Sequence, residues 1–264
     1  MSIQATHLNV RPVRAFADNY IWLIESPRSP HQVVAVDPGE ADPVLAELKR
    51  QDLSLAAILL THHHPDHIGG VPALLQHAKV PVIGPDDSRI ALKTHTLRDG
   101  ERCELPDLGL EFETLHVPGH TVSHIALFGH GSLFCGDTLF SAGCGRMFEG
   151  TPEQMNASLD RLRDLPPDTQ VFCGHEYTAA NLRFALTVEP SNIATQEYQE
   201  SVQRIRSAGD PSLPSTLSME IRVNPFLRCD KPNVRAAAEA RAGKSLAEPA
   251  EVFGVLRAWK DTFR

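Results

Sequence analysis

One short segment of the chain carries its densest group of side chains that could bind metal. Thr61–His67 contains four histidines and one aspartate, and it directly follows Ala56–Leu60, an apolar run of strand length. Neutral imidazole is the commonest metal ligand in proteins. A strand that ends in such a cluster predicts a metal site, and the competing interpretation is a histidine-rich surface loop.

The spacing inside this segment predicts two pairs of ligands. His62 and His64 are two residues apart, so in extended backbone they point the same way. Pro65 disfavours continued strand pairing. If the chain turns there, Asp66 and His67 face a second point close to the first. We therefore predict one ion on His62 and His64 and another on Asp66 and His67.

Three later residues, each preceded by a glycine, extend this ligand set. They follow predicted strands and are His120, Asp137 and His175. Singly, each is more typical of a capping or solvated residue, but together with the first cluster they give seven ligands. If Asp137 bridges, one ion has His62, His64, His120 and Asp137, and the other has Asp66, His67, His175 and Asp137. His63, which alternates away, and His116 are predicted not to be ligands.

This ligand count predicts two divalent ions roughly 3.5–4 Å apart. A shared hydroxide would bring each ion to five-coordination, which catalytic zinc accepts. We expect zinc, and iron or manganese also suit a set of nitrogen and oxygen ligands that lacks a thiolate.

Composition places the chain among ordinary globular proteins. It has 264 residues, 42% hydrophobic and 22% charged, and is long enough for one large domain or for one domain with a smaller appendage. A net charge of −8 disfavours a nucleic-acid surface. Five cysteines without a C-x-x-C pair predict free thiols in a reducing compartment. The sequence shows neither a secretion signal at Met1–His7 nor an apolar membrane span, so we expect a cytoplasmic protein, and a monomer.

Hydrophobic periodicity predicts an α/β fold in which two sheets pack face to face with helices outside. The predicted strands are Tyr20–Ile24, Val33–Val36, Ala56–Leu60, Val80–Ile83, Leu110–His116, Ile125–Phe128, Leu133–Cys135 and Val171–Cys173. The predicted helices are Asp42–Arg50, Gly70–His77, Pro152–Leu165, Tyr177–Val188, Ile193–Ala208, Asn233–Arg241 and Pro249–Phe263. Strands are expected to stop after about residue 175, which divides the chain into a catalytic domain, 1–174, and a helical domain, 175–264.

Several motifs make the chain resemble the metallo-β-lactamase superfamily and, within it, the hydroxyacylglutathione hydrolase (glyoxalase II) family. The His-x-His-x-Asp-His pattern alone indicates only the superfamily. The narrower likeness runs over nearly the whole chain and is carried by Asp18-Asn19-Tyr20, Pro118–Thr121, Gly136–Phe140, Gly143–Arg146, Cys173–Thr178, Val188-Glu189-Pro190, Asn224-Pro225-Phe226 and Arg257-x-x-Lys260.

The resemblance implies an αββα sandwich followed by a helical domain, and hydrolysis of S-D-lactoylglutathione to glutathione and D-lactate in methylglyoxal detoxification. It implies that Asp66 and Asp137 act in catalysis with the metal-bridging hydroxide. It also implies glutathione contacts from Arg146, Tyr177, Arg257 and Lys260. The last two are three residues apart and share a helix face, where they could meet the carboxylates of glutathione. Phe148 stands where family members often have tyrosine, which removes a hydroxyl contact.

Other functions remain open at this point. A lactonase could use the same seven ligands. A mononuclear persulfide dioxygenase would not need both His67 and His175, and many β-lactamases have cysteine in place of Asp137. The net charge disfavours a nuclease of the superfamily. A non-catalytic glutathione or metal binder is the alternative from outside the enzymes.

Overall fold

The computed structural model describes residues 8–263, so the expectation about a secretion signal at Met1–His7 lies outside the described residues. The chain forms two compact units. Within the described residues, the first comprises 8–116 and 123–136, and the second comprises 117–122 and 137–263. The predicted division after residue 174 stays a prediction.

A mixed sheet forms the centre of the first unit. Its strand order is β1 (Val10–Ala15), β2 (Asn19–Glu25), β3 (Gln32–Val36), β4 (Ser54–Leu59), β5 (Val82–Pro85) and β6 (His95–Leu97). The pairs β1–β2 and β2–β3 are antiparallel, whereas β3 to β6 run parallel. The parallel strands β3 and β4 therefore end at the same edge of the sheet, where Asp37 and the histidine segment begin.

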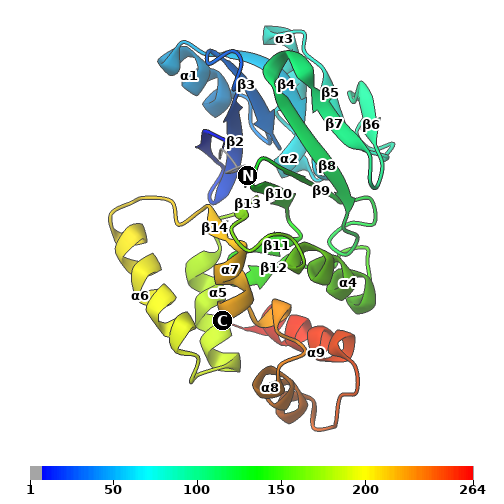
Figure 1. Cartoon of the computed structure of the whole chain (residues 1–264), viewed down its shortest axis with the longest axis vertical. Coiled ribbons are helices and arrows are strands. Elements are labelled where there is room, and N and C mark those ends of the chain that lie inside the picture. The colour runs from blue at the N-terminus through cyan, green and yellow to red at the C-terminus, as the bar shows by residue number, and fades with distance from the viewer. Residues whose placement is uncertain (1–7, 264) are drawn as a thin grey trace, which may run out of the picture. The chain divides into compact units, whose positions relative to one another are not determined.

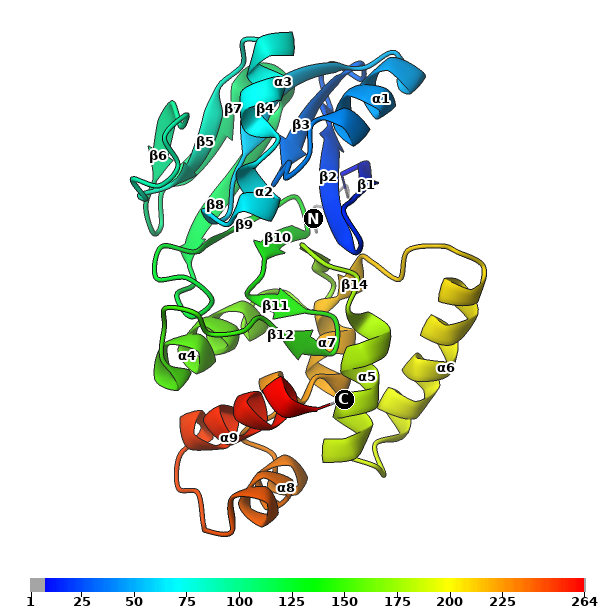
Figure 2. The ribbon, with the colours of Figure 1, turned by 180° about the vertical axis from the view of Figure 1, so that it is seen from behind.

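Helices cover one face of this sheet. Val44 and Leu48 of α1 (Asp42–Gln51) and Leu74 of α3 (Val71–His77) are buried in one apolar cluster with sheet residues such as Val33 and Ile58. Between these helices lies the single turn α2 (Pro65–Ile68). Figure 2 shows α1 and α3 in front of the sheet.

The rest of the first unit is an antiparallel meander. It consists of β7 (Arg102–Leu105), the 3₁₀ turn η1 (Pro106–Leu108), β8 (Leu110–His116), β9 (Ile125–Gly129) and β10 (Ser132–Gly136). In Figure 1, β8 lies in front of the first sheet, on the side away from α1 and α3. The unit thus has a helix layer and two sheet layers, and β8 and β10 end where the segments with His120 and Asp137 begin.

The second unit is mainly helical. Its strands are short: β11 (Leu139–Phe140) pairs with β12 (Gly143–Cys144), and β13 (Gln170–Cys173) pairs with β14 (Ser215–Thr216). Its helices are α4 (Pro152–Arg163), α5 (Thr178–Val188), α6 (Ile193–Ser207), α7 (Leu217–Val223), α8 (Pro232–Ala242) and α9 (Pro249–Thr262), with the turn η2 (Pro225–Leu227). Thr151 caps α4 with a reciprocal capping box to Gln154, which explains the sharp start of that helix.

Most predicted elements are confirmed to within about two residues at each end, and one expectation is wrong. Strands do not stop after residue 175, because Ser215 and Thr216 pair with Val171 and Gln170. Two residues between Pro214 and a helix are too few to show a strand period.

All five cysteines are buried free thiols. None of the helices within residues 8–263 combines the length and apolar character needed to cross a bilayer.

Candidate metal centre

The end of β4 brings the histidines of the first unit together. His62 is fully buried, and its ring centroid lies 4.8 Å from that of His64 and 4.1 Å from that of His67. The predicted turn at Pro65 is confirmed: Pro65 opens α2, and the His67 amide donates to the His64 carbonyl at 2.9 Å. This turn carries Asp66 and His67, whose Oδ2 and Nε2 atoms lie 3.5 Å apart.

Asp37, which the sequence analysis missed, fixes the orientation of His67. The carboxylate is buried and accepts hydrogen bonds from the Thr61 amide at 2.8 Å and the Thr61 hydroxyl at 2.6 Å. Its Oδ2 also lies 3.0 Å from Nδ1 of His67. An Nδ1–H group that donates to a carboxylate leaves Nε2 with its lone pair for a metal, which is the usual orientation device for ligating histidines.

Asn19 orients Asp66 in a similar way. Its Nδ2 donates to Asp66 Oδ2 at 3.0 Å. The backbone of Gly39 also passes so close that a Cβ there would lie 1.9 Å from the Asp66 carbonyl oxygen. Only glycine fits this approach, so the position of Asp66 depends on two residues that lie far from it in sequence.

His124 is a further buried histidine that sequence spacing did not identify. Its ring stacks on His62 with centroids 4.6 Å apart and planes 18° from parallel. The contact limits the rotation of the His62 ring. Its only sequence signal is a histidine just before an apolar strand, which is too common to be diagnostic.

The second unit brings its three predicted ligands to one point. Oδ2 of Asp137 lies 3.5 Å from Nε2 of His120 and 3.3 Å from Nε2 of His175, and all three residues are buried. Nδ1 of His120 lies 2.8 Å from the Arg146 carbonyl oxygen, so an Nδ1–H donates there and Nε2 keeps its lone pair for a metal. Both imidazoles therefore direct Nε2 at the same carboxylate oxygen.

These separations suit metal ligation. Two ligand atoms about 2.1 Å from one ion, in near-tetrahedral directions, lie roughly 3.4 Å apart. The pairs Asp66–His67, His120–Asp137 and His175–Asp137 have this spacing. The described residues thus contain His/Asp clusters able to hold metal ions. Asp37 forms one such cluster with His62 and His67, but its hydrogen bonds assign it to orientation.

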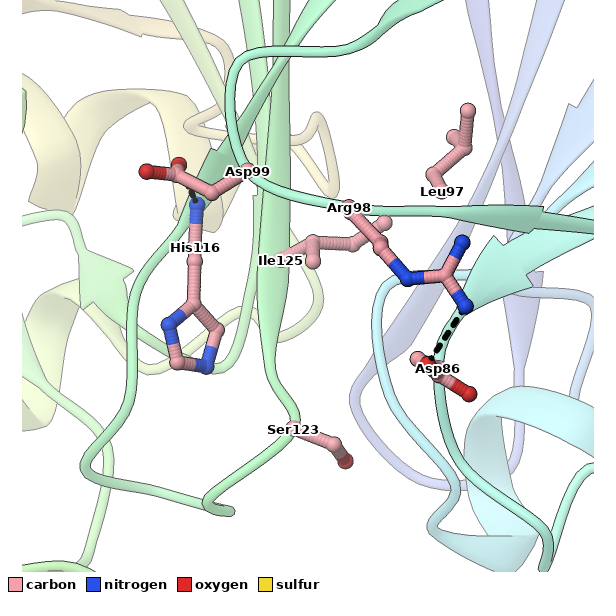
Figure 3. Close-up of a pocket in the computed structure, with 7 residues that line it drawn as sticks. All are labelled: Asp86, Leu97, Arg98, Asp99, His116, Ser123 and Ile125. Atoms are coloured by element: carbon pink, nitrogen blue, oxygen red, sulfur yellow. Dashed lines mark hydrogen bonds and ion pairs between the residues drawn. The ribbon is translucent and has the colours of Figure 1, made fainter.

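The two histidines predicted not to be ligands have other surroundings. Nδ1 of His63 lies 3.4 Å from Asp87, a carboxylate whose pKa is held low mainly by its hydrogen bonds to Arg89. His116 lines a separate pocket of about 200 Å³ in the first unit, together with Asp86, Leu97, Arg98, Asp99, Ser123 and Ile125 (Figure 3). None of the seven predicted ligands lines this pocket.

Two of the residues expected to bind glutathione are exposed. Tyr177 stacks on His175 with centroids 4.7 Å apart and planes 7° from parallel, so its ring covers a predicted ligand. The Arg146 side chain is 63% exposed and reaches Asp261 at 3.5 Å. Phe148 is also exposed, and its ring lies edge-on to that of His120, with the ring centroids 5.3 Å apart.

The other two belong to α9. Arg257 and Lys260 share a face, as predicted, but that face is turned inward. Arg257 is buried and donates to the Cys144 carbonyl at 2.8 Å and to Asp261 at 3.1 Å. Lys260 is partly buried beside the Phe184 ring, and loss of hydration lowers its pKa to about 8.

Comparisons with known proteins agree with this geometry. The family described as "Metallo-beta-lactamase superfamily" matches residues 16–175, and "Hydroxyacylglutathione hydrolase C-terminus" matches residues 176–263. A curated relative from Aeromonas hydrophila subsp. hydrophila, named hydroxyacylglutathione hydrolase, is 54% identical over 95% of this chain and 98% of its own length.

Solved structures extend the likeness to the fold. The BLEG-1 B3 metallo-beta-lactamase matches with a TM-score of 0.64 and 23% identity, over 83% of this chain and 99% of that one. TTHA1623, solved in a di-iron-bound form, matches with a TM-score of 0.60 and 27% identity, over 82% of this chain and 99% of that one. The predicted fold class, an αββα sandwich followed by a helical region, is confirmed.

Proposed function

This chain belongs to the hydroxyacylglutathione hydrolase family of the metallo-β-lactamase superfamily, and we propose that it hydrolyses S-D-lactoylglutathione to glutathione and D-lactate. The observation that carries the proposal is the convergence of His120 and His175 on one oxygen of Asp137. It supplies a metal-ready carboxylate in a chain that matches hydroxyacylglutathione hydrolases over nearly its whole length.

We propose that seven residues hold two divalent ions: His62, His64, His120 and Asp137 for one, and Asp66, His67, His175 and Asp137 for the other. Zinc is our first choice, and the absence of a thiolate from the set also suits iron or manganese. The di-iron form of TTHA1623 supports two ions on this fold. Asp137 is the proposed bridge because its Oδ2 lies close to one histidine of each set.

The ions, when bound, would supply Lewis acidity and lower the pKa of a water molecule. The chain's own residues then have distinct tasks. Asp37 and the Arg146 carbonyl hold His67 and His120 in the ligating tautomer. Asp66, held by Asn19, orients the attacking water as well as serving as a ligand. The leaving thiolate of glutathione has a pKa near 8.5 and needs no dedicated general acid.

For the glutathione moiety we propose Arg146, Tyr177, Arg257 and Lys260. Arg146 and Tyr177 are exposed beside the predicted ligands. Lys260 offers an ammonium group to a substrate carboxylate. Arg257 is buried, and two of its nitrogens donate to Cys144 and Asp261, so we propose that it offers a substrate carboxylate its positive charge.

We also propose that the protein acts as a cytoplasmic monomer without a nucleic-acid partner. Five buried thiols suit a reducing compartment, and a net charge of −8 disfavours binding to phosphate backbones.

The test compares thioester and lactone hydrolysis by the same metal-loaded preparation. We expect turnover of S-D-lactoylglutathione, and loss of at least about 10³-fold in kcat for Asp137→Ala, because a positioned ligand is removed. Asp168→Ala, at an exposed position, is the matched control and should retain full activity. Faster hydrolysis of a lactone than of the thioester would instead make the chain a lactonase.

A further inference from the structure

The turn between β11 and β12 is built in a strained conformation inside the second unit. Ala142 has a φ of 55°, in the left-handed region that non-glycine residues seldom adopt. Ser141, Ala142 and Gly143 are all buried. A buried turn of this kind persists only where surrounding groups hold it, so the side chains that contact it keep it in this conformation.

Side chains from the helical segments of the second unit donate hydrogen bonds to the backbone carbonyls of this turn. Nδ2 of Asn224 donates to the carbonyls of Phe140 at 3.1 Å and Gly143 at 2.9 Å. Nδ2 of Asn181 donates to the Ser141 carbonyl at 3.0 Å. Together with Arg257 on Cys144, these contacts fix the hairpin from outside.

Glu220 of α7 supplies the remaining contacts. Its carboxylate is fully buried, and it accepts from the Ser141 hydroxyl at 2.9 Å and from the Ala142 amide at 2.7 Å. Nδ2 of Asn224 is a third donor at 3.2 Å. These partners are neutral. Because burial of a carboxylate costs free energy unless hydrogen bonds compensate it, these donors hold Glu220 and the turn in one fixed arrangement.

The hairpin leads directly to the proposed site. The ring of Phe140 packs edge-on against His175, with centroids 5.8 Å apart, and against Tyr177 at 5.3 Å. Tyr177 and His175 are themselves stacked. A shift of the turn would therefore move Phe140 and change the tilt of the exposed Tyr177 ring.

We propose that Glu220 is a positioning residue: its carboxylate holds the Ser141–Ala142 turn so that Phe140 sets the orientation of Tyr177 for substrate binding. The inference rests on the proposed function, because Tyr177 is a proposed glutathione contact. The helical region would then position the Tyr177 ring as well as contact glutathione directly.

The first experiment measures steady-state kinetics of Glu220→Gln with S-D-lactoylglutathione. The amide keeps the shape, but its NH2 group either meets the N–H donors of Ala142 and Asn224 or makes the Ser141 hydroxyl accept instead of donate. The charge-assisted contacts of the carboxylate are lost in both cases, so we expect KM to rise about tenfold, kcat to change less than about threefold, and metal content to stay unchanged. Glu200→Gln, the same change at an exposed site of α6, should match the wild type. A KM within twofold of the wild type in folded Glu220→Gln would overturn the proposal.

A second variant and a second readout cover two further outcomes. If Glu220→Gln does not fold, Ser141→Ala removes one donor only, and its KM should rise about threefold; an unchanged KM contradicts the proposal.

If the wild type shows no turnover, the proposed function fails, but NMR still tests whether Glu220 positions the Tyr177 ring. The chain has three tyrosines, and the Tyr177 ring protons should shift in Glu220→Gln and not in Glu200→Gln.

Discussion

Replacing Asp37 by asparagine is the sharpest available perturbation of the candidate metal centre. Asp37 is not a proposed ligand, yet its Oδ2 accepts from both the Thr61 hydroxyl and His67 Nδ1, and its Oδ1 accepts from the Thr61 amide. An asparagine of the same shape must set its NH2 group against at least one N–H donor in either orientation. The most accessible relief is for His67 to move its proton to Nε2, which removes the lone pair that the metal needs.

The expected size of the loss in metal affinity follows from what such orienting groups contribute in other metal sites. Loss of a group that orients a ligating histidine typically weakens metal binding 10–100-fold. Because each tenfold change is about 1.4 kcal/mol, the expected loss is about 1.4–2.8 kcal/mol. Asp37 is almost fully buried, so solvent screening does not reduce this figure appreciably.

The assay is competition with a chelator of known affinity at pH 7, with thermal unfolding of the metal-loaded protein recorded alongside. Asp107→Asn, the same change at an exposed position of the first unit, is the control and should bind metal within twofold of the wild type. A folded Asp37→Asn variant with wild-type metal affinity would refute the assignment of Asp37 as the orienting group of His67.

Three further predictions follow from the second unit. Because the pKa of Lys260 is lowered to about 8, its positive charge is lost as pH rises through that value, and kcat/KM should fall above about pH 8. In a pH–rate profile, Lys260→Arg should move this fall to higher pH, because arginine stays charged. A Cβ on Gly145 would lie 1.9 Å from the Asp137 carbonyl oxygen, so Gly145→Ala should lower kcat/KM by about 100-fold in the thioester assay. Burial raises the pKa of Glu220 above 4.5, so the folded state binds its proton more tightly than the unfolded state. The free energy of unfolding should therefore decrease as pH rises from 4.5 through the folded pKa. In Glu220→Gln, denaturant titrations should show a free energy of unfolding that depends less on pH over this range.

The sequence could predict which histidines and aspartates cluster because most of them follow a strand and several share one short segment. His62, His64, Asp66 and His67 fall within seven residues, and Pro65 forces the turn between them. Local spacing therefore determines most of this half of the site. The long helices and strands were predictable for the same reason, since an apolar period over many residues is a strong signal.

The groups that orient the ligands could not be found in this way. Asp37 and Asn19 lie 30 and 47 residues from His67 and Asp66, and only the order of strands in the sheet brings them together. Spacing also shows that Arg257 and Lys260 share a face but not that this face is turned inward. Strands of two residues, such as β12 and β14, have too few positions to display a period.

The most direct test of the account is metal titration of the purified protein after chelation, with S-D-lactoylglutathione hydrolysis followed as loss of thioester absorbance on the same samples. We predict no turnover without metal and activity that rises until about two ions are bound per chain. Full turnover by the metal-free protein, or two bound ions without any thioester hydrolysis, would contradict the account.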